Sequence, residues 1–507
     1  MQTLPSGHDS GLVLAPFRGV RYDPDRVSGI ANVTSPPYDV IGSGTLDELL
    51  AAEPHNIVRL ILPGFGLDAG ADAGGAGTAG GAGTAGGAGT AGGAGTAGGA
   101  GTAGGAGAAN ARAASRLHDW LASGVLAPDP EPALYVYEQR GAGWLQRGLI
   151  GLVPVGTPDS AGILPHEGVM PGPVTGRRQL MMATRANLEP IFLVYNGGAG
   201  QADSPGLGTG SAAGSGGHRG PAGPEPTVPV TASGLVRLTA EEREPLFTAV
   251  TDDGITHRLW RLTDPADHAT VAGDLAGRTA LIADGHHRYA AYRELRDLMR
   301  GDGHGTGPWD FGLAFIVDAD EHPPQLGAIH RVIPHLAPED AALLAAEAFT
   351  VEELSAVGAS LSDGEVLDGL ETALRRLAEA GRRGTAFLLA GRSGYRLLTD
   401  PDHEQLQASM PPEASPRWQA LDASIMQELL MARLWSIKDN ERDVLISHHA
   451  GEAVQMALDA SGTAVLCNPV PFGAVKEVAD HGERVPRKST SFGPKPRTGL
   501  VLRTWEP

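Results

Sequence analysis

A glycine-rich hexapeptide repeat limits what this chain can fold into. From Gly66 to about Gly107 the sequence repeats AGGAGT, nearly perfectly from Ala73 onward. Glycine, alanine and threonine offer little apolar surface to offset the entropy lost on ordering, so we expect a flexible surface insertion; a glycine-rich structural array is the alternative. A second stretch rich in Gly, Ser, Ala and Pro, from Asn196 to about Pro229, predicts another such loop. The remaining sequence must build the core.

Charge and cysteine content exclude several functional classes. The net charge of -20 repels phosphate backbones and anionic membranes, so we expect neither a nucleic-acid nor a membrane partner. Cys467 is the only cysteine, so the chain forms no internal disulfide and no cysteine-based zinc site. The beginning of the sequence lacks a basic leader, and no apolar run reaches the roughly 18 residues of a membrane span. We expect a cytoplasmic protein that acts on a small molecule; its oligomeric state stays open.

Alternating apolar runs and helical patterns predict a mixed α/β (α+β) fold, with mixed sheets and packed helices. The expected strands are 58–62, 133–137, 147–155, 256–262, 279–283 and 311–319. The expected helices are 111–121, 177–186, 338–347, 363–380 and 420–434. We divide the chain into three α/β units: 1–235, which the two insertions interrupt, 236–345 and 346–507.

The strongest local feature is the segment ADGHHRY, where a predicted strand enters a glycine turn and then a helix. Free backbone amides and the positive end of the helix dipole suit a phosphate at such a turn, and the arginine would add a bidentate contact. The histidines would donate hydrogen bonds or shuttle a proton. The alternative is an aspartate cap with two packed histidines. The candidate residues are Asp284, Gly285, His286, His287 and Arg288.

Two further loops carry carboxylates. His166 and Glu167 lie together in LPHEGVMPGP, a loop bounded by proline and glycine. A histidine beside a carboxylate suits a general base with its partner or a pair of metal ligands, and a solvated loop is the alternative. Asp39 follows a double proline that fixes an extended backbone, and it is either catalytic or a simple turn residue.

Lysine is scarce in this chain. The basic residues number 39, and the lysines are Lys438, Lys476, Lys488 and Lys495. The last two lie with Ser489 and Thr490 in VPRKSTSFGPKPRTG, a proline-stiffened loop that suits an anion, although a flexible basic tail is the alternative. Arg185, at the end of the helix expected at 177–186, would reach a phosphate or face water.

Several blocks in this order resemble the uncharacterised family called domain of unknown function 1015. The blocks are LAPFRGVRY, SPPYDVI, HNIVRLILP, ILPHEGVMPGP, MMATRANLEPIF, IADGHHRYAA, AIHRVI and RKSTSFGPK. The DGHHR turn is also similar to the nucleotide-contacting turn of the ParB and sulfiredoxin superfamily. That second resemblance implies a ParB/sulfiredoxin-like nucleotide-binding unit, with phosphate contacts from Asp284, Gly285, His287 and Arg288.

The chain also departs from that superfamily. The turn reads GHHR at positions 285–288 and has no cysteine, which argues against sulfinic acid reduction. The acidic balance and the lack of a helix-turn-helix pattern argue against DNA partition.

Together, the resemblances and the residues lead us to expect a nucleotide-dependent phosphotransferase that acts on a small hydroxyl-bearing metabolite, with a free serine kinase as its most concrete form. The cofactor would be ATP or another nucleoside triphosphate, which implies Mg²⁺. Glu167 or Asp39 would accept the hydroxyl proton, while Lys488 and Lys495 would neutralise charge on the phosphates. One alternative is a nucleotide-binding regulatory protein without turnover. Another is a metal-dependent hydrolase that uses His166, Glu167, His286 and His287.

The repeat gives a first testable prediction. Deletion of the tract from Ala73 to Ala108 should leave the melting temperature and any activity nearly unchanged, because loop closure costs only roughly 0.6 kcal/mol per doubling of loop length. Thermal unfolding of both proteins checks this. A melting temperature lowered by many degrees would show that the tract packs against the core.

Overall fold

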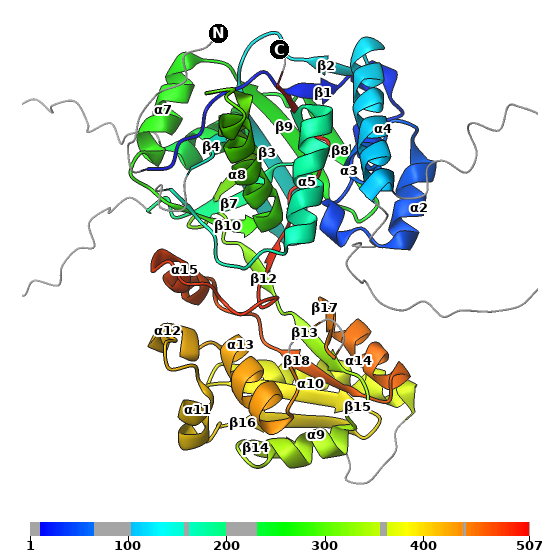
Figure 1. The fold of residues 1–507 in the computed structure, drawn as a ribbon, viewed down its shortest axis with the longest axis vertical. Coiled ribbons are helices and arrows are strands. Elements are labelled where there is room, and N and C mark those ends of the chain that lie inside the picture. The colour runs from blue at the N-terminus through cyan, green and yellow to red at the C-terminus, as the bar shows by residue number, and fades with distance from the viewer. Residues whose placement is uncertain are drawn as a thin grey trace, which may run out of the picture.

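The structure, a computed structural model, describes residues 11–64, 103–156, 162–198, 231–354, 362–438, 440 and 443–505. Most of both predicted insertions, 66–102 and 199–229, lies outside these residues. The described residues form a mixed α/β protein, which confirms the expected fold class (Figure 1). None of the helices among them is long and apolar enough to cross a membrane.

A large mixed sheet forms the first unit. Among the described residues it has eight strands in the order β5-β10-β7-β11-β4-β3-β9-β8. β7 and β11 are parallel, whereas β10 and β4 run antiparallel to them on either side. The bounds are β3 Leu134–Gly141, β4 Trp144–Pro154, β5 Ile163–Leu164, β7 Ile191–Tyr195, β8 Phe247–Val250, β9 Thr256–Leu262, β10 Ala280–Asp284 and β11 Phe311–Asp318.

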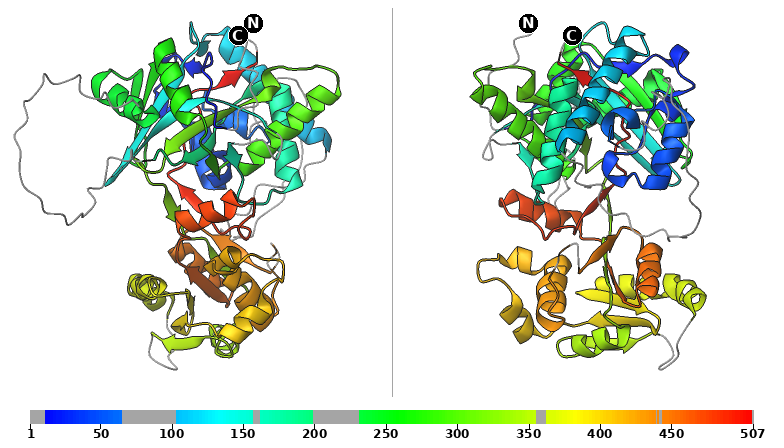
Figure 2. Two further views of the ribbon diagram at one scale, coloured as in Figure 1. Left: turned by 90° about the vertical axis from the view of Figure 1, so that its left-hand side faces the viewer. Right: turned by 45° about the vertical axis from the view of Figure 1, so that its right-hand side comes forward.

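Helices cover this sheet because apolar side chains alternate to both of its faces. One core contains Leu134 and Val136 of β3 with side chains from four helices, namely α5 Pro171–Thr184, α6 Ala232–Glu242, α7 Pro265–Leu275 and α8 His286–Gly301. α4, Ala103–Ala122, packs on α5, which packs on α8. The other face buries Tyr135 and Tyr137 with Val475 of α15, Phe472–Asp480. Figure 2 shows α15 between the two sheets of the molecule.

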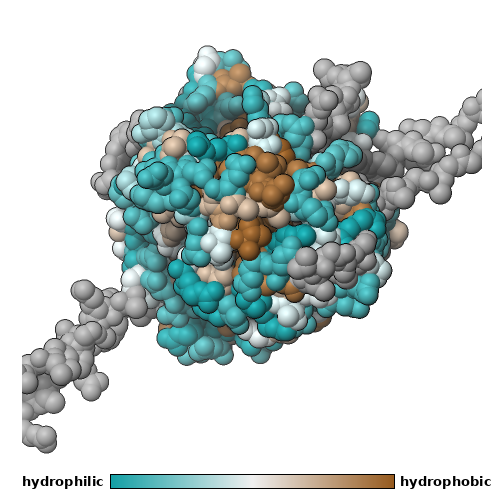
Figure 3. All heavy atoms as spheres, turned by 90° about the horizontal axis from the view of Figure 1, so that it is seen from below, coloured by the Kyte–Doolittle hydropathy of each residue, from teal (hydrophilic) through white to brown (hydrophobic). Residues whose placement is uncertain are grey.

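A smaller sheet forms the second unit. Its six strands, again within the described residues, follow the order β14-β16-β15-β18-β13-β17. They are β13 His330–Ile333, β14 Thr350–Glu353, β15 Ala386–Gly391, β16 Gly394–Thr399, β17 Leu445–Ser447 and β18 Thr463–Cys467. α10 (Asp363–Gly381) and α14 (Ala450–Asp459) cover one face, while α9 (Pro338–Ala345) and a π-helix at Met426–Leu434 cover the other. Seen from this end, the surface is mostly hydrophilic with a small apolar area (Figure 3).

The chain passes between the units twice. It leaves the first unit after β11 through β12, Gln325–Gly327, and returns through α15 and β19, Ser491–Gly493, which pairs with β12. Beyond β19 it stays in the first unit, where Thr498 exchanges backbone hydrogen bonds with Ser35 and Leu502 does so with Val20. The lysine-containing loop of the sequence therefore lies at the junction of the units.

Three expectations from sequence need correction. The division at 235 and 345 is wrong, because β8 to β11 share a sheet with β3 and the end of the chain rejoins the first unit. The apolar run at 58–62 forms the buried helix α3, Val58–Ile61, and not a strand. The repeat tract was expected to extend to about 107, but α4 begins at Ala103, so a deletion that spares the fold must end at Thr102.

Candidate functional site

The site begins where β10 ends and α8 starts. β10 is entirely buried between β5 and β7, and Gly285 takes a left-handed backbone with φ 94° before α8. A Cβ at this position would meet Ile191 Cγ2 at 3.0 Å. Both the positive φ and the close approach favour glycine, and the turn leaves the first amides of α8 facing outward from the helix.

Lys495 joins three segments that are distant in sequence. Its Nζ lies 2.6 Å from Asp284 Oδ1 and 2.7 Å from Asp39 Oδ2. Burial would lower the pKa of Lys495, but the two carboxylates outweigh it and raise the pKa. Desolvation would raise the pKa of Asp39, but Lys495 and then Arg288 lower it to about 2. The site therefore holds the ammonium of Lys495 between the carboxylates of Asp39 and Asp284, an arrangement that we call the clamp. Asp39 is ionised at neutral pH.

Arg288 lies behind this clamp and not at its surface. Its guanidinium donates to Asp284 Oδ2 at 2.5 Å and to the carbonyl of Pro190 at 2.7 Å, and it lies 3.9 Å from Glu189. The side chain is only 3% exposed. The expected direct contact with phosphate is therefore corrected: Arg288 positions Asp284, and the charges around it are already paired.

A chain of hydrogen bonds orients Glu167. Thr490 Oγ1 donates to Glu167 Oε1 at 2.7 Å, so His166 Nε2, 2.9 Å from the same hydroxyl, donates to it. Burial lowers the pKa of His166 to about 3, which keeps the ring neutral. Burial raises the pKa of Glu167 against the opposing effects of Thr490 and Lys488. Glu167 is thus a partly buried carboxylate with an elevated pKa, held in place by its neighbours.

The two histidines of the turn have structural partners. His286 is buried, and its Nε2 accepts the backbone N–H of His166 at 3.3 Å. His287 Nε2 accepts the backbone N–H of Met170 at 3.1 Å. Desolvation lowers the pKa of both rings. His286 therefore packs against the loop that carries Glu167, and His287 fixes that loop; a catalytic role of His286 stays a prediction.

The other predicted residues divide into two groups. Thr490 and Lys488 lie at the site, since the first contacts Glu167 and the second acts on its pKa. Ser489 is buried and donates to the carbonyl of Pro486 at 2.7 Å, so it stabilises the loop and is not placed to contact a ligand. Arg185 ends the 14-residue α5, whose other end carries the His287 contact; at about 1.5 Å per residue it is about 20 Å away.

Sequence reasoning missed two residues. Glu189 lies 3.6 Å from Arg177 and accepts the backbone N–H of Tyr38 at 3.3 Å, besides facing Arg288. Its only signal was a carboxylate directly before a buried strand. His448 of the second unit shares its electrostatic environment with Lys495 and Lys488. Its signal was an adjacent histidine pair directly before a helix, whereas the pair of the DGHHR turn forms the first two residues of α8.

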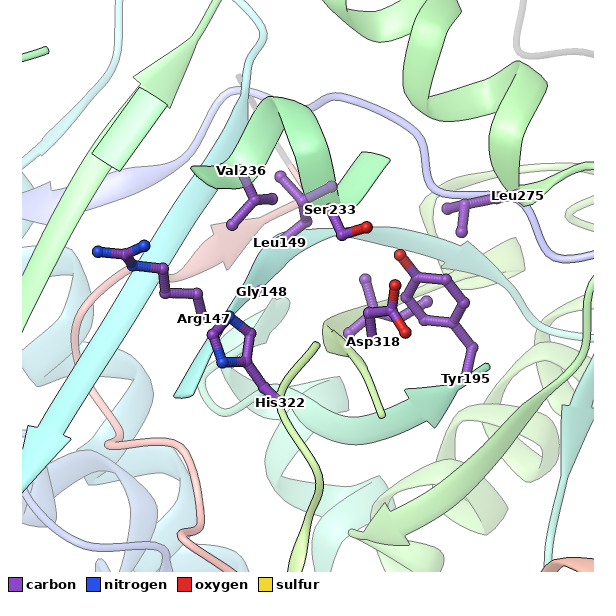
Figure 4. A pocket seen from close by; sticks show the side chains of 10 residues that line it. Arg147, Gly148, Leu149, Tyr195, Ser233, Val236, Leu275, Asp318 and His322 are labelled. Carbon is purple, nitrogen blue, oxygen red and sulfur yellow. The ribbon is translucent and has the colours of Figure 1, made fainter. Parts of the chain in front are cut away.

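A cavity elsewhere in the first unit is too small to hold a ligand. It lies over the large sheet and is lined by Tyr195, Ser233, Asp318 and His322 among others (Figure 4). Its volume of about 10 Å³ suffices for about one water molecule. The clamp around Lys495 is therefore the better candidate site.

Comparisons with known proteins bear on the family and little else. The family model described as "Protein of unknown function (DUF1015)" matches residues 14–79, 101–204 and 227–424, which confirms the resemblance seen in the sequence. No curated protein matches the chain.

Three solved structures show a distant likeness. A free serine kinase variant in complex with ADP is 12% identical with a TM-score of 0.30, over 68% of this chain and 87% of that chain. SbnI with a C-terminal truncation, from Staphylococcus aureus, is 11% identical with a TM-score of 0.30, over 69% and 84%. A conserved hypothetical protein from Pyrococcus furiosus is 12% identical with a TM-score of 0.27, over 68% and 90%. A likeness at these identities and TM-scores does not indicate which ligands this chain binds or what activity it has.

The paired state of Arg288 gives a prediction. Arg288→Ala should lower the free energy of unfolding by about 3–5 kcal/mol, because it breaks the buried ion pair with Asp284 and leaves Asp284 with Lys495 alone and Glu189 with Arg177 alone. Chemical denaturation followed by tryptophan fluorescence measures this. Arg375→Ala removes an exposed ion pair on α10 and should cost less than about 1 kcal/mol. Equal effects of the two substitutions would contradict the positioning role.

Proposed function

The chain belongs to the DUF1015 family of proteins of unknown function, and from its own site we propose that it is a nucleotide-dependent phosphotransferase acting on a small hydroxyl-bearing metabolite. The observation that carries the proposal is the meeting of lysines and carboxylates beside the start of α8. They come from four segments of the chain and comprise Asp39, Glu167, Asp284, Lys488 and Lys495.

The start of α8 and the two lysines suit a nucleotide's phosphates. The first amides of a helix after a glycine turn bind anions, and lysine supplies a compact positive charge. Within the described ranges Lys488 forms no ion pair, so its ammonium is available to a phosphate, whereas Lys495 is shared with two carboxylates.

Mg²⁺ would fit the same arrangement. In proteins it typically takes one or two carboxylates together with phosphate oxygens and water. Asp39 would be such a carboxylate, because only its Oδ2 is engaged by Lys495, whereas both oxygens of Asp284 are bound by Lys495 and Arg288; among the residues that the structure covers, no group of three or more His, Cys, Asp or Glu side chains could hold a metal ion. When bound, the ion would neutralise charge on the phosphates.

In the proposed reaction, the acceptor's hydroxyl oxygen attacks the terminal phosphorus of the nucleotide. The new P–O bond forms as the bond to the bridging oxygen breaks, and the nucleoside diphosphate leaves with that electron pair. Glu167 accepts the hydroxyl proton. We favour it over Asp39 because its pKa is raised, and a base works best when its pKa lies nearer the working pH, whereas that of Asp39 is about 2.

The two alternative functions make different demands on the site. A nucleotide-binding regulatory protein would use the same phosphate contacts without forming a phosphorylated product. A metal-dependent hydrolase would need free imidazole nitrogens, but Nε2 of His286 and Nε2 of His287 already accept backbone N–H groups. The site therefore gives the hydrolase less support than the transferase.

A kinetic prediction tests the transferase and separates Lys488 from a generic positive charge. A thermal-shift screen identifies the nucleotide, and mass spectrometry of a metabolite pool, with L-serine included, identifies the acceptor. Lys488→Ala should then lower kcat by more than about tenfold and weaken nucleotide binding less, because the charge it neutralises develops in the transition state. Lys488→Arg should restore activity poorly.

Lys438→Ala serves as the control, because this lysine follows the π-helix of the second unit and should not affect turnover. Tight nucleotide binding without any phosphorylated product would favour the regulatory alternative. Near-parental turnover in Lys488→Ala would remove that residue from the reaction.

The pH dependence tests Glu167 as the base. Because only the ionised carboxylate accepts a proton, kcat should fall as the pH drops through the raised pKa of Glu167. Glu167→Gln should lower kcat by about 100-fold or more at pH values above that pKa, where the parent carboxylate is ionised, and should abolish the acidic limb. Steady-state rates between pH 5 and about 9 measure both effects. A retained acidic limb in Glu167→Gln would shift the role to another group, with Asp39→Asn as the next variant.

A further inference from the structure

The second unit reaches the candidate site through one edge strand. β17 pairs with β13 so that Ile446 lies opposite Arg331 and Ser447 opposite His330. His448 follows directly, at the point where the chain turns into α14. β13 begins shortly after β12, the strand by which the chain leaves the first unit. The position of His448 is therefore fixed relative to the junction.

The stretch of chain from β12 to β13 also holds the loop that contains Lys488. The guanidinium of the buried Arg331 donates to the backbone carbonyl of Arg487 at 3.0 Å, and Gly327 of β12 pairs with Ser491. Lys488 lies between these two attachments. The strand that precedes His448 and the loop that contains Lys488 are thus both attached to one continuous segment, residues 327–331.

The turn that presents His448 is well ordered by its neighbours. Ser447 Oγ accepts the backbone N–H of His449 at 3.0 Å and lies 2.6 Å from Glu452 Oε2. Within the described part of the chain, no hydrogen bond or ion pair engages the imidazole of His448. A fixed backbone with an uncommitted ring is what a ligand contact requires.

The electrostatics place this ring within the field of the candidate site. Loss of hydration, followed by the positive charges of Lys495 and Lys488, lowers the pKa of His448, and Asp39 opposes them. His448 therefore lies within the electrostatic influence of Lys488, Lys495 and Asp39, although it belongs to the other unit. At neutral pH the neutral ring offers one N–H donor.

We propose that His448 is a ligand-contacting residue, through which the second unit holds an anionic group of the molecules bound beside Lys488 and Lys495. The inference rests on the proposed function for the identity of those molecules. The anionic group is either a phosphate of the nucleotide or a carboxylate of the acceptor, because both accept an imidazole N–H and both are attracted by the lysines. The ligand then contacts both units, and the second unit contributes to specificity.

Pyrophosphate is the probe that tests this without an assumption about activity. Calorimetric titration of the full-length protein should give an affinity that His448→Ala weakens about 3- to 10-fold, the loss of one hydrogen bond to an anion. His448→Gln retains an N–H donor and should recover part of it. His403→Ala, on α11 (His403–Ser409) of the same unit, should leave the affinity unchanged. An unchanged affinity in His448→Ala, or no binding by the parent protein, overturns the phosphate contact, and the kinetics below then decide the contact with the acceptor's carboxylate.

Kinetics with the nucleotide and acceptor distinguish the two sources of the anion. If His448 holds the acceptor's carboxylate, His448→Ala raises KM for the acceptor and leaves the nucleotide's Kd unchanged. If it holds a phosphate, the nucleotide's Kd rises instead. An unchanged KM and Kd overturn the inference. If the parent protein transfers no phosphate to any acceptor, the proposed function fails, while the pyrophosphate titration still decides whether His448 contacts a phosphate.

Discussion

The ammonium of Lys495 between two carboxylates is the interaction on which the junction of this molecule depends. Asp39 comes from the beginning of the chain, Asp284 from the end of β10, and Lys495 from the segment that returns from the second unit. Removing a charge from water costs free energy unless the charge is paired. Pairing Lys495 with Asp39 and Asp284 therefore favours the contact among the three segments. The clamp ties the returning chain to the first unit and places its loop beside the start of α8.

Much of the fold follows from local patterns. The apolar runs that form β9, β10 and β11 are strands as predicted, and the helical spacing before Gly381 gives α10. The run at 58–62 was predicted as a strand but forms a helix, because so short an apolar run does not reveal its period. The grouping into units could not be predicted, since strands distant in sequence are neighbours in the sheet.

The sequence indicated several residues of the site, but it did not indicate which partner each of them contacts. The scarcity of lysine marked Lys488 and Lys495, and the DGHHR turn marked Asp284, but no local pattern shows which charged side chain lies inside. Arg288 is buried because Glu189, almost a hundred residues earlier, lies beside it. His448 was missed because it reaches the site only through pairing of β17 with β13. Long-range pairing decides such roles, and a single sequence does not reveal it.

If the Lys495 clamp beside α8 is a phosphate site, the protein binds nucleoside triphosphate with Mg²⁺ there, and a titration measures that binding. Calorimetry on the parent protein and on Lys495→Met compares affinities, with circular dichroism to verify that the variant is folded. The parent should bind measurably and the variant at least about tenfold more weakly, because a charge-assisted contact contributes about 1.5–3 kcal/mol. Equal affinity in the two folded proteins would show that the Lys495 clamp does not hold phosphate.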